Sequence, residues 1–420
     1  MALVVACVHK APAVYVAPIA AVTRAVAVGP IRAVAGDGAH VFVASGESLA
    51  WGERSVALPG TIGPIAATGH LVAATLSITG DAKLAAAPIA MRGEPGAVVA
   101  AFDVATGAAA WRVPLDASEY AIATSICIAP DDGFIVGGSF AGTLRAGEGA
   151  ASAIVSSAGK SDGFVVRIAP SGAVTWLVRL GGMGADAVQG VAFAGDRVAI
   201  TGTFATGAEL AGVPLPPFDD RLPFADIFVA ELDVATGARK WATTFGGRGD
   251  DSATGIAIDP ATGNVAVAAN LRGTMRVGTR ELKANGASDG LVVWLSPAGE
   301  LGATTILGGP DFDGTRAIVA VGDDAIVAGF FSGTIALGSA HFAAGGGDDA
   351  FLAEVTPAGA VVRAWQVGGA GREEIASLAA LGGGFVAGVA HTAELVLSGI
   401  HLPAPQDPML GAALVIRGVP

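Results

Sequence analysis

One segment, residues 162–182, recurs along the chain and constrains its fold more than any other feature. It reads DGFVVRIAPSGAVTWLVRLGG. Close copies occupy residues 226–247, 289–309 and 349–369, and a degenerate copy occupies residues 97–115. A supersecondary unit that recurs along a chain indicates a repeat architecture, in which each unit buries its apolar faces against its neighbours.

Each copy is predicted to contain two β-strands joined by a turn. In the first strand of residues 162–182, Phe164, Val166 and Ile168 fall on one face, which is the period of two that a strand requires. The opposite face is mostly apolar too, so we expect these strands to be covered on both sides. The turn carries a glycine, which adopts positive φ at little cost. These glycines are Gly172, Gly237, Gly299 and Gly359.

A pair of glycines at the end of each copy sets the period. The pairs begin at Gly181, Gly246, Gly308 and Gly368, so consecutive copies lie 65, 62 and 60 residues apart. Two further strands are predicted between the copies, and four strands per unit are typical of a β-propeller blade. The sequence therefore predicts an all-β, seven-bladed β-propeller with four-stranded antiparallel blades. Six or eight blades stay open as alternatives, because the first unit, residues 31–60, is degenerate.

The last predicted unit, which begins near residue 370, lacks a fourth strand. The chain ends in GAALVIRGVP, which corresponds to a third strand, whereas residues 23–29 (TRAVAVG) resemble residues 175–181 (TWLVRLG). We therefore expect the N-terminal strand to complete the last blade, which removes an exposed sheet edge. In this division residues 1–22 form an N-terminal apolar segment, and residues 23–420 form a single propeller domain.

The composition agrees with such a fold and excludes some classes of function. Of 420 residues, 52% are hydrophobic, 15% are charged and 62 are glycine. The net charge of -13 argues against binding to nucleic acid or anionic lipid, since both require clustered Lys and Arg. The two cysteines, Cys7 and Cys127, provide neither a disulfide framework nor paired metal ligands. We expect a monomer that binds no nucleic acid.

The N-terminus carries one motif that bears on localisation. Residues 4–7, Val-Val-Ala-Cys, resemble a bacterial lipobox, at which a signal peptide is cut and the cysteine is lipidated. The resemblance implies a lipid anchor at Cys7 and an extracytoplasmic location, in the periplasm, as an outer membrane lipoprotein or at the cell surface. The segment before Cys7 has no basic n-region and only a short apolar run. The alternative, that Cys7 is an ordinary residue of an apolar terminus, therefore stays open.

The repeat resembles a known family. The pattern Asp-x-Phe-x-x-x-x-x-Pro-x-Gly, followed by Trp and then by Gly-Gly-x-x-x-Asp, is similar to the SBBP-type β-propeller repeat of predicted lipoproteins from myxobacteria and related bacteria. The similarity covers about residues 116–400. It implies a propeller fold and an exported location at the bacterial cell envelope, but it implies no reaction, because the members are mostly uncharacterised.

A second resemblance is to the repeats of quinoprotein-type propellers, which read Leu-Asp-x-x-Thr-Gly-x-x-x-Trp. Residues 232–241 match this motif, and residues 102–111 match it with Phe in place of Leu. The motif packs blades together and also occurs in scaffold propellers. The chain has neither the adjacent cysteine pair nor an evident Glu, Asn and Asp set for calcium and quinone. An enzyme on this fold is therefore the alternative, and no catalytic residue or cofactor is predicted.

Acidic residues recur at two positions of the repeat. One set follows the glycine pairs, at Asp186, Asp251, Asp313 and Glu373. The other begins the third strand of each unit, at Asp162, Asp226, Asp289 and Asp349. Both positions are expected on one rim of the propeller. The simpler interpretation is that each carboxylate accepts backbone N–H bonds and holds its turn. The alternative is a ring of carboxylates that binds calcium or a cationic ligand.

The aromatic and histidine residues are predicted to have structural roles and not to form a functional site. Trp111, Trp176 and Trp241 occupy one repeat position, which predicts packing between blades. The six histidines form no ligand pair, and we expect His341 and His391 in loops or on blade surfaces. The predicted channel strands, residues 190–194, 254–258 and 318–321, offer mainly Ala, Gly, Val and Ile. This favours a binding or scaffold module for a protein or glycan, because catalysis requires convergent polar groups.

Overall fold

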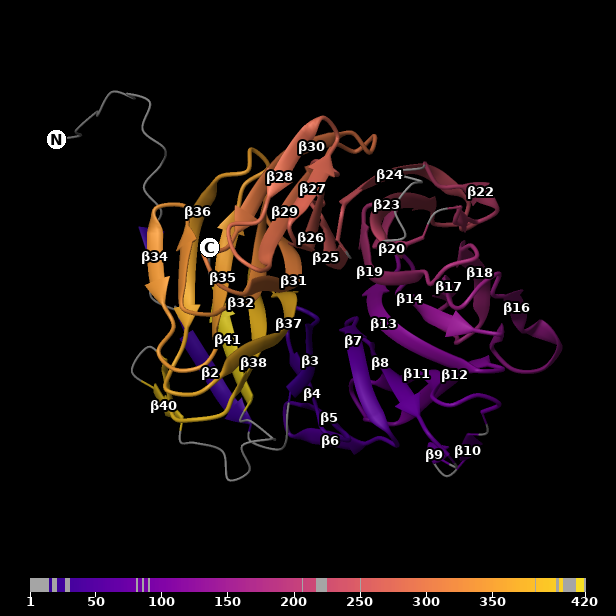
Figure 1. Ribbon diagram of the computed structural model, residues 1–420. Coiled ribbons are helices and arrows are strands. Elements are labelled where there is room, and N and C mark those ends of the chain that lie inside the picture. The colour runs from indigo at the N-terminus through magenta and orange to yellow at the C-terminus, as the bar shows by residue number, and fades with distance from the viewer. Residues whose placement is uncertain are drawn as a thin grey trace.

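The computed structural model describes residues 15–16, 21–26, 31–80, 82–84, 87–89, 91–205, 207–216, 225–249, 251–381, 383–397, 400–402 and 413–418. The chain forms an all-β propeller, whose sheets are arranged radially around a central axis (Figure 1). Within the described ranges the one helical element is a short 3₁₀ turn, η1 (Gly149–Ala151), and no helix is long and apolar enough to cross a membrane. Cys7 lies outside the described residues.

The first three sheets come from the N-terminal part of the chain, and the strands are given from the axis outward. The first contains β3 (Ile31–Gly36), β4 (Val41–Ser45), β5 (Ser48–Trp51) and β6 (Arg54–Ala57). The second contains β7 (Thr61–Ala67), β8 (Leu71–Ile78), β11 (Gly96–Asp103) and β12 (Ala109–Ala117). The third contains β13 (Tyr120–Ile128), β14 (Phe134–Ala141), β17 (Asp162–Ile168) and β18 (Val174–Gly181).

The remaining sheets follow the same order. One contains β19 (Ala187–Ala194), β20 (Arg197–Phe204), β23 (Asp226–Asp233) and β24 (Arg239–Gly247). The next contains β25 (Ser252–Ile258), β26 (Val265–Leu271), β29 (Asp289–Leu295) and β30 (Leu301–Leu307). It is followed by β31 (Asp313–Val321), β32 (Asp324–Phe331), β35 (Asp349–Val355) and β36 (Val361–Val367). The last contains β37 (Glu373–Leu381), β38 (Gly384–His391), β41 (Ala413–Gly418) and β2 (Ala21–Val26).

The two ends of the chain meet in this last sheet. Strand β2 pairs with β41 in antiparallel register, with Ala21 opposite Arg417. The N-terminal strand thus lies where the repeat predicts it, although it begins two residues before the expected residues 23–29. The preceding short strand, β1 (Tyr15–Val16), pairs in parallel with β36. Pairing at both places covers strand edges that would otherwise be open.

Short hairpins between the second and third strands of most sheets were not predicted. They are β9 (Ala82–Leu84) with β10 (Ala87–Ile89), β15 (Thr143–Ala146) with β16 (Ala153–Ser156), β21 (Glu209–Leu210) with β22 (Val213–Pro214), β27 (Thr274–Val277) with β28 (Arg280–Lys283), β33 (Thr334–Leu337) with β34 (Ala340–Ala343), and β39 (Leu395–Leu397) with β40 (Ile400–Leu402). Three of them extend the preceding sheet, because β15, β21 and β27 pair with β12, β18 and β24. They cover outer strands that would otherwise be edges.

The third strands of the central sheets are buried on both faces, as their apolar pattern predicts. Every residue of β29 and β35 is buried, and six of the seven residues of β17 are. Phenylalanines at the ends of second strands pack edge-on against the third strands, as between Phe140 and Phe164 at a centroid distance of 6.3 Å. Burial on both faces is what a strand between two neighbouring sheets requires, so the core is distributed over the blade junctions.

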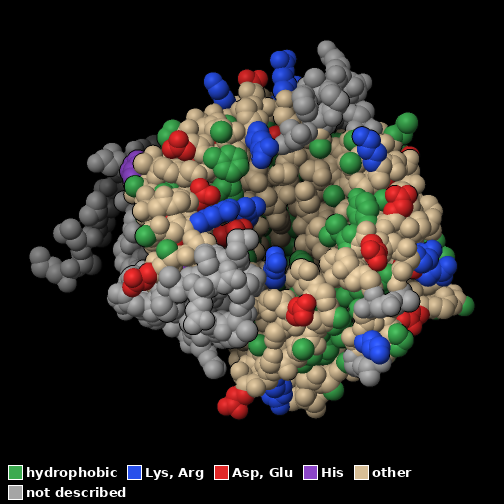
Figure 2. All heavy atoms as spheres, turned by 60° about the horizontal axis from the view of Figure 1, so that its bottom comes forward, with side chains coloured by type: hydrophobic (Ala, Val, Ile, Leu, Met, Phe, Trp, Pro, Cys, Tyr) green, Lys and Arg blue, Asp and Glu red, His purple; other side chains and the backbone are tan. Residues whose placement is uncertain are grey.

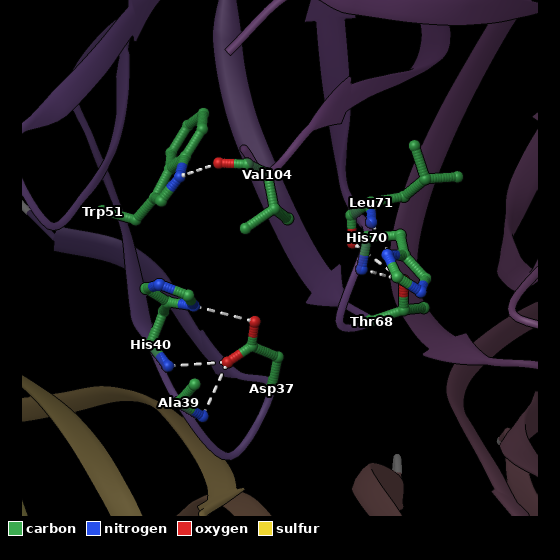
Figure 3. Close-up of polar contacts among 8 residues, drawn as sticks. All are labelled: Asp37, Ala39, His40, Trp51, Thr68, His70, Leu71 and Val104. Carbon is green, nitrogen blue, oxygen red and sulfur yellow. Dashed lines mark hydrogen bonds and ion pairs between the residues drawn. The ribbon is translucent and has the colours of Figure 1, made fainter. Parts of the chain in front are cut away.

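Tryptophans connect neighbouring blades, as predicted from their repeat position. The indole of Trp176 donates to the backbone oxygen of Val234 at 3.0 Å, and a β-carbon at Gly237 would lie 3.0 Å from that ring. Figure 3 shows the equivalent bond from Trp51 to the oxygen of Val104, at 2.9 Å. The glycine turn of one blade therefore receives the tryptophan of the blade before it, because a side chain there would collide with the indole.

The turn itself explains the motif shared with quinoprotein-type repeats. Asp233 accepts hydrogen bonds from the backbone N–H and the hydroxyl of Thr236, at 2.9 and 2.8 Å. These bonds hold the pKa of Asp233 below its ordinary value. Gly237 follows with a φ of 73°, in the left-handed region that favours glycine. The motif is a turn that packs on the neighbouring blade.

Candidate functional site

All inner strands begin at the same end of the ring, which we call the start face. It carries the connections from each fourth strand to the next inner strand and from each second strand to its third. The opposite end, the turn face, carries the connections between first and second and between third and fourth strands. Two turns of that face are drawn in Figure 3, where Asp37 accepts the N–H groups of Ala39 and His40, and Thr68 accepts that of His70.

The eight acidic residues predicted from the repeat lie at the start face with their side chains buried. Their exposed fractions are between 0% and 7%. These residues are Asp162, Asp186, Asp226, Asp251, Asp289, Asp313, Asp349 and Glu373. The expected common rim position is therefore found, but the carboxyl groups point into the blade junctions and form no exposed ring.

The acids that follow the glycine pairs hold the turns there. Asp186, Asp313 and Glu373 each accept a hydrogen bond from the backbone N–H of the second glycine of the pair. Asp186 also accepts the N–H of Ala205 at 2.6 Å, from the following connection. A carboxylate with such donors stabilises a tight turn, in agreement with the simpler of the two interpretations of these acids.

The two sets of acids meet in pairs across the blade junctions. Burial raises the pKa of Glu373 to about 7, and the charge of Asp349 adds to the effect. Burial likewise raises the pKa of Asp313 to about 6, with the charges of Asp289 and Asp311 adding to the effect. Two buried carboxyl groups in contact favour a shared proton, because both cannot be charged cheaply in a medium of low polarity. Among the described residues no group of three or more His, Cys, Asp or Glu is placed to hold a metal ion.

The inner strands enclose a channel along the axis. Its cavity has a volume of about 610 Å³ and is lined by residues of β3, β7, β13, β19, β25, β31 and β37. The lining includes residues 190–194 and 254–258, as predicted, and is mostly aliphatic. Cys127 belongs to it, and burial raises the pKa of its thiol to about 12, so the thiol stays protonated. Figure 2 shows a hollow near the middle of the molecule, with charges of both signs interspersed around it.

Each inner strand is interrupted by a β-bulge at the same level of the channel. The register between first and second strands shifts between Val188 and Gly190, and at equivalent places in the other sheets. The shifts leave one extra residue on the inner strand of most sheets. These residues are Arg32, Thr124, Gln189, Thr254, Arg316 and Ala376, with Gly63 and Pro64 in the second sheet.

Several polar side chains at the bulges connect neighbouring inner strands. The hydroxyl of Thr124 donates to the oxygen of Val188 at 2.6 Å, and the hydroxyls of Thr254 and Thr315 are 2.7 Å apart. Ser377 accepts the N–H of Val34 at 3.2 Å, which joins β37 to β3 across the closure of the ring. These hydroxyls are therefore used within the fold.

Two other bulge side chains are not fully engaged. Arg316 has an exposed side chain whose Nε lies 3.2 Å from Glu374 Oε1. The Oε1 atom of Gln189 is buried and finds no hydrogen-bond partner among the described residues. Buried polar atoms are almost always satisfied, so such an atom marks a place where a ligand or solvent donor fits.

Three exposed apolar side chains lie on the start face. Met183 and Phe312, which lie in loops between fourth and inner strands, are 87% and 43% exposed, and Ile122, near the start of β13, is 40% exposed. The loop of Phe312 is fixed by two backbone bonds, from Ala287 to the oxygen of Asp311 and from Asp313 to the oxygen of Ser288. Rigid exposed apolar side chains are typical of protein-binding surfaces.

The histidine predictions have mixed outcomes. His341 is exposed on β34, as expected. The expectation for His391 is wrong, because it is fully buried in β38, where its Nδ1 bonds the oxygen of Ala393 at 2.6 Å. His391 occupies the strand position at which Phe331 lies in the preceding sheet, and both are paired with the first acid of the inner strand. The repeat therefore places this strand position in the core, whether a phenylalanine or a histidine occupies it.

Sequence reasoning missed the bulge residues, although a signal exists. An alternating strand has one residue between inward-facing apolar positions, whereas Val188 and Val191 are separated by two, Gln189 and Gly190. The same spacing recurs around Arg316 and Ala317. This phase slip marks a bulge once the repeat has been aligned.

Comparison with known proteins finds similarity to solved structures at low sequence identity. No protein-family model matches the sequence, and no curated protein matches it either. Similar solved structures include the β-propeller BamB from Moraxella catarrhalis, at 15% identity over 94% of this chain and 98% of that chain, with a TM-score of 0.40. The Dos1 propeller matches at 10% identity over 98% and 95%, with a TM-score of 0.48. The quinohemoprotein alcohol dehydrogenase ADHIIG from Pseudomonas putida HK5 matches at 10% identity over 95% and 76%, with a TM-score of 0.41.

Proposed function

We propose that this protein is an exported, non-catalytic β-propeller that binds a protein partner on its start face, as a binding or scaffold module at the cell envelope. The observation that carries the proposal is the placement of Ile122, Met183 and Phe312. These apolar side chains are exposed on one face of the ring. A protein partner suits them better than a glycan, since sugars are held mainly by polar groups and aromatic faces.

The channel supports binding over catalysis. Its lining is mostly aliphatic, and the hydroxyls of Thr124, Thr254 and Ser377 are committed to bonds between inner strands. An enzyme on this fold would need a nucleophile, base or cofactor set that converges on a substrate. The buried carboxyl pairs lie in blade junctions, and their polar contacts are with the surrounding turns.

We further propose that the ring has seven blades of the SBBP type. Support comes from the inner strands β3, β7, β13, β19, β25, β31 and β37, each of which contacts the next, and from the contact of β37 with β3. The pairing of β2 with β41 supplies the fourth strand of the last blade. The exported location and a lipid anchor at Cys7 rest on the lipobox-like residues 4–7.

Site-specific photocrosslinking in cells tests the start face. We expect a photoreactive amino acid at Met183 or Ile122 to give one adduct of the same mass. His70, in the turn between β7 and β8, is the control, because it is exposed but lies on the turn face. An adduct from His70 of equal yield, or none from either start-face position, would contradict the proposal.

A further inference from the structure

We propose that the start face recognises an acidic side chain, Asp or Glu, in an extended segment of the partner protein, with Arg316 as the residue that binds its carboxylate. This inference rests on the proposed function and specifies the chemistry of the partner. Three features of the channel mouth carry it: the unused edge of the Arg316 guanidinium, the exposed ring of Phe312, and the buried oxygen of Gln189.

Arg316 is held in position before any ligand arrives. It is the bulge residue of β31, its guanidinium carbon lies 4.8 Å from the centroid of the Phe330 ring, and its Nε contacts Glu374 at 3.2 Å. Glu374 is also 4.0 Å from Arg372, which pairs with Asp348 at 3.5 Å. Contacts on one face and one edge fix the plane of the guanidinium, which lowers the entropy lost when a ligand binds.

The remaining edge of this guanidinium is free. In the described part of the chain no acceptor contacts its Nη1 or Nη2 atoms, and Arg316 is the only charged side chain among those that line the channel. A guanidinium edge with two N–H groups matches a carboxylate in bidentate geometry. Arg32, the exposed bulge residue of β3, adds a second positive charge at the same level, two inner strands away. The channel mouth is therefore complementary to one carboxylate.

Phe312 provides an apolar contact next to this position. Its ring packs on Phe330 at a centroid distance of 5.5 Å, so Phe312 and Arg316 share one aromatic neighbour. The 43% of Phe312 that is exposed can cover an apolar residue adjacent to the acid. A fixed aromatic ring beside an arginine is the combination found at the energetic centres of protein interfaces.

Gln189 favours a peptide over a free carboxylate. It occupies the bulge of β19, at the level of Arg316 with β25 between them, and its buried Oε1 needs a donor. A peptide segment offers backbone N–H groups along its length, whereas a simple dicarboxylate offers none. The cavity of about 610 Å³ is within the range of ligand-binding pockets, which is roughly 300–1,000 Å³.

Selection from a phage-displayed library of short random peptides tests the proposal on the full chain. We expect wild-type protein to enrich peptides in which Asp or Glu adjoins an apolar residue, and Arg316→Gln to lose that enrichment. The affinity of the strongest synthetic peptide should fall about tenfold or more with Arg316→Gln and with Phe312→Ala. It should not change with Arg54→Gln, the control on the exposed outer strand β6. Replacing the acid of the peptide by its amide should weaken binding to the wild type equally.

The other outcomes overturn the proposal. Enriched peptides without an acid, no enrichment at all, or equal affinity for Arg316→Gln would each contradict it. Full competition by N-acetylglutamate at concentrations near the peptide Kd would identify a small carboxylate as the ligand instead. Unchanged melting of Arg316→Gln shows that its fold is intact. Arg316→Lys keeps the charge but loses the planar pair of parallel N–H groups, so it should bind more weakly than wild type. If Met183 still crosslinks to a partner while no acidic peptide is enriched, the proposed binding face stands and the acidic ligand is rejected.

Discussion

At the scale of single residues, the carboxyl groups of the blade junctions are the most unusual feature. A buried carboxylate is stable only where donors replace its water, and here the N–H groups of the glycine pairs supply them, as from Gly182 to Asp186. Glycine is required beside these acids, since a β-carbon at Gly308 would lie 2.4 Å from the carboxyl carbon of Asp289. Glycine and acid therefore recur together because the glycine pair donates N–H groups to the carboxylate and leaves room for it.

Substituting Glu373 by Gln should make the protein more stable at neutral pH. Burial raises the pKa of Glu373 from 4.5 to about 7, so the folded state binds this proton more tightly than the unfolded state does. The resulting stability is complete below pH 4.5 and is lost as the pH rises to about 7. Across that window the wild type should lose roughly 2–3 kcal/mol that Glu373→Gln retains. Chemical denaturation at a series of pH values measures the difference.

The neighbouring Glu374 provides the control for this experiment. It is partly exposed and pairs with Arg316, so Glu374→Gln should keep the wild-type slope of stability against pH between 4.5 and 7. A flat profile in the wild type would show that Glu373 is not protonated in the fold.

Calcium should change the stability little. A cation bound only by the folded state stabilises it by RT ln(1 + [L]/Kd), about 2.7 kcal/mol at a hundred times Kd. We expect a difference under about 1 kcal/mol between chelator and millimolar calcium. The reason is that the acids at the junctions bond backbone N–H groups, as Asp313 does with Ser332 at 3.2 Å. A large rise in melting temperature with calcium, lost in Asp251→Asn with Asp313→Asn, would instead identify a metal site.

At the scale of elements, two regular deviations from an ideal strand build the propeller. The bulges turn Gln189 and most of its equivalents into the channel. In most sheets the residue after the bulge is small, because the next inner strand packs against it. A β-carbon at Gly190 would lie 3.0 Å from the side chain of Ile256, and one at Gly255 would lie 3.1 Å from that of Ile318. The second deviation is the tryptophan of one blade that packs on the glycine turn of the next.

Replacing Trp176 by Ala should destabilise the protein by roughly 3–5 kcal/mol, the range for removing a large aromatic side chain from a packed interior. Trp176 is 8% exposed, and its indole donates to Val234 across the blade junction. Trp176→Phe, which keeps most of the buried area, should lose clearly less. Denaturant unfolding gives both values, and a loss below about 1 kcal/mol for Trp176→Ala would place the ring outside the packed core.

At the scale of the whole molecule, the repeat was sufficient for the fold class but not for the site. Alternation in residues 162–168 and the glycine turns predict strands because each is a local preference. The phase slip at Arg316 marks a repeated bulge but not the role of its side chain, and Phe312 belongs to no repeated motif. Their contact through Phe330 arises only when the chain folds. The short outer hairpins were missed for a related reason, because strands such as β21 are two residues long and carry no period.

Removing residues 1–30 should sharply lower stability, whereas removing residues 1–20 should leave most of it. The longer deletion takes away β2, which pairs with β41, while the shorter one removes only β1 and its brief pairing with β36. Thermal unfolding and size-exclusion chromatography of both truncations measure the effect, because an open edge on β41 also promotes association. Equal melting temperatures would show that β2 does not hold the ring closed.

The pairing of β2 with β41 also has a consequence for synthesis. A ribosome completes Ala21–Val26 long before Ala413–Gly418, because the strands of all the other sheets lie between them in the sequence. Strand β2 therefore has no partner until β41 has been synthesised, and a nascent chain, or one terminated before β41, presents an unpaired strand edge. A closed ring thus requires translation as far as β41, and a protease that recognises unpaired strands can degrade copies that stop before it.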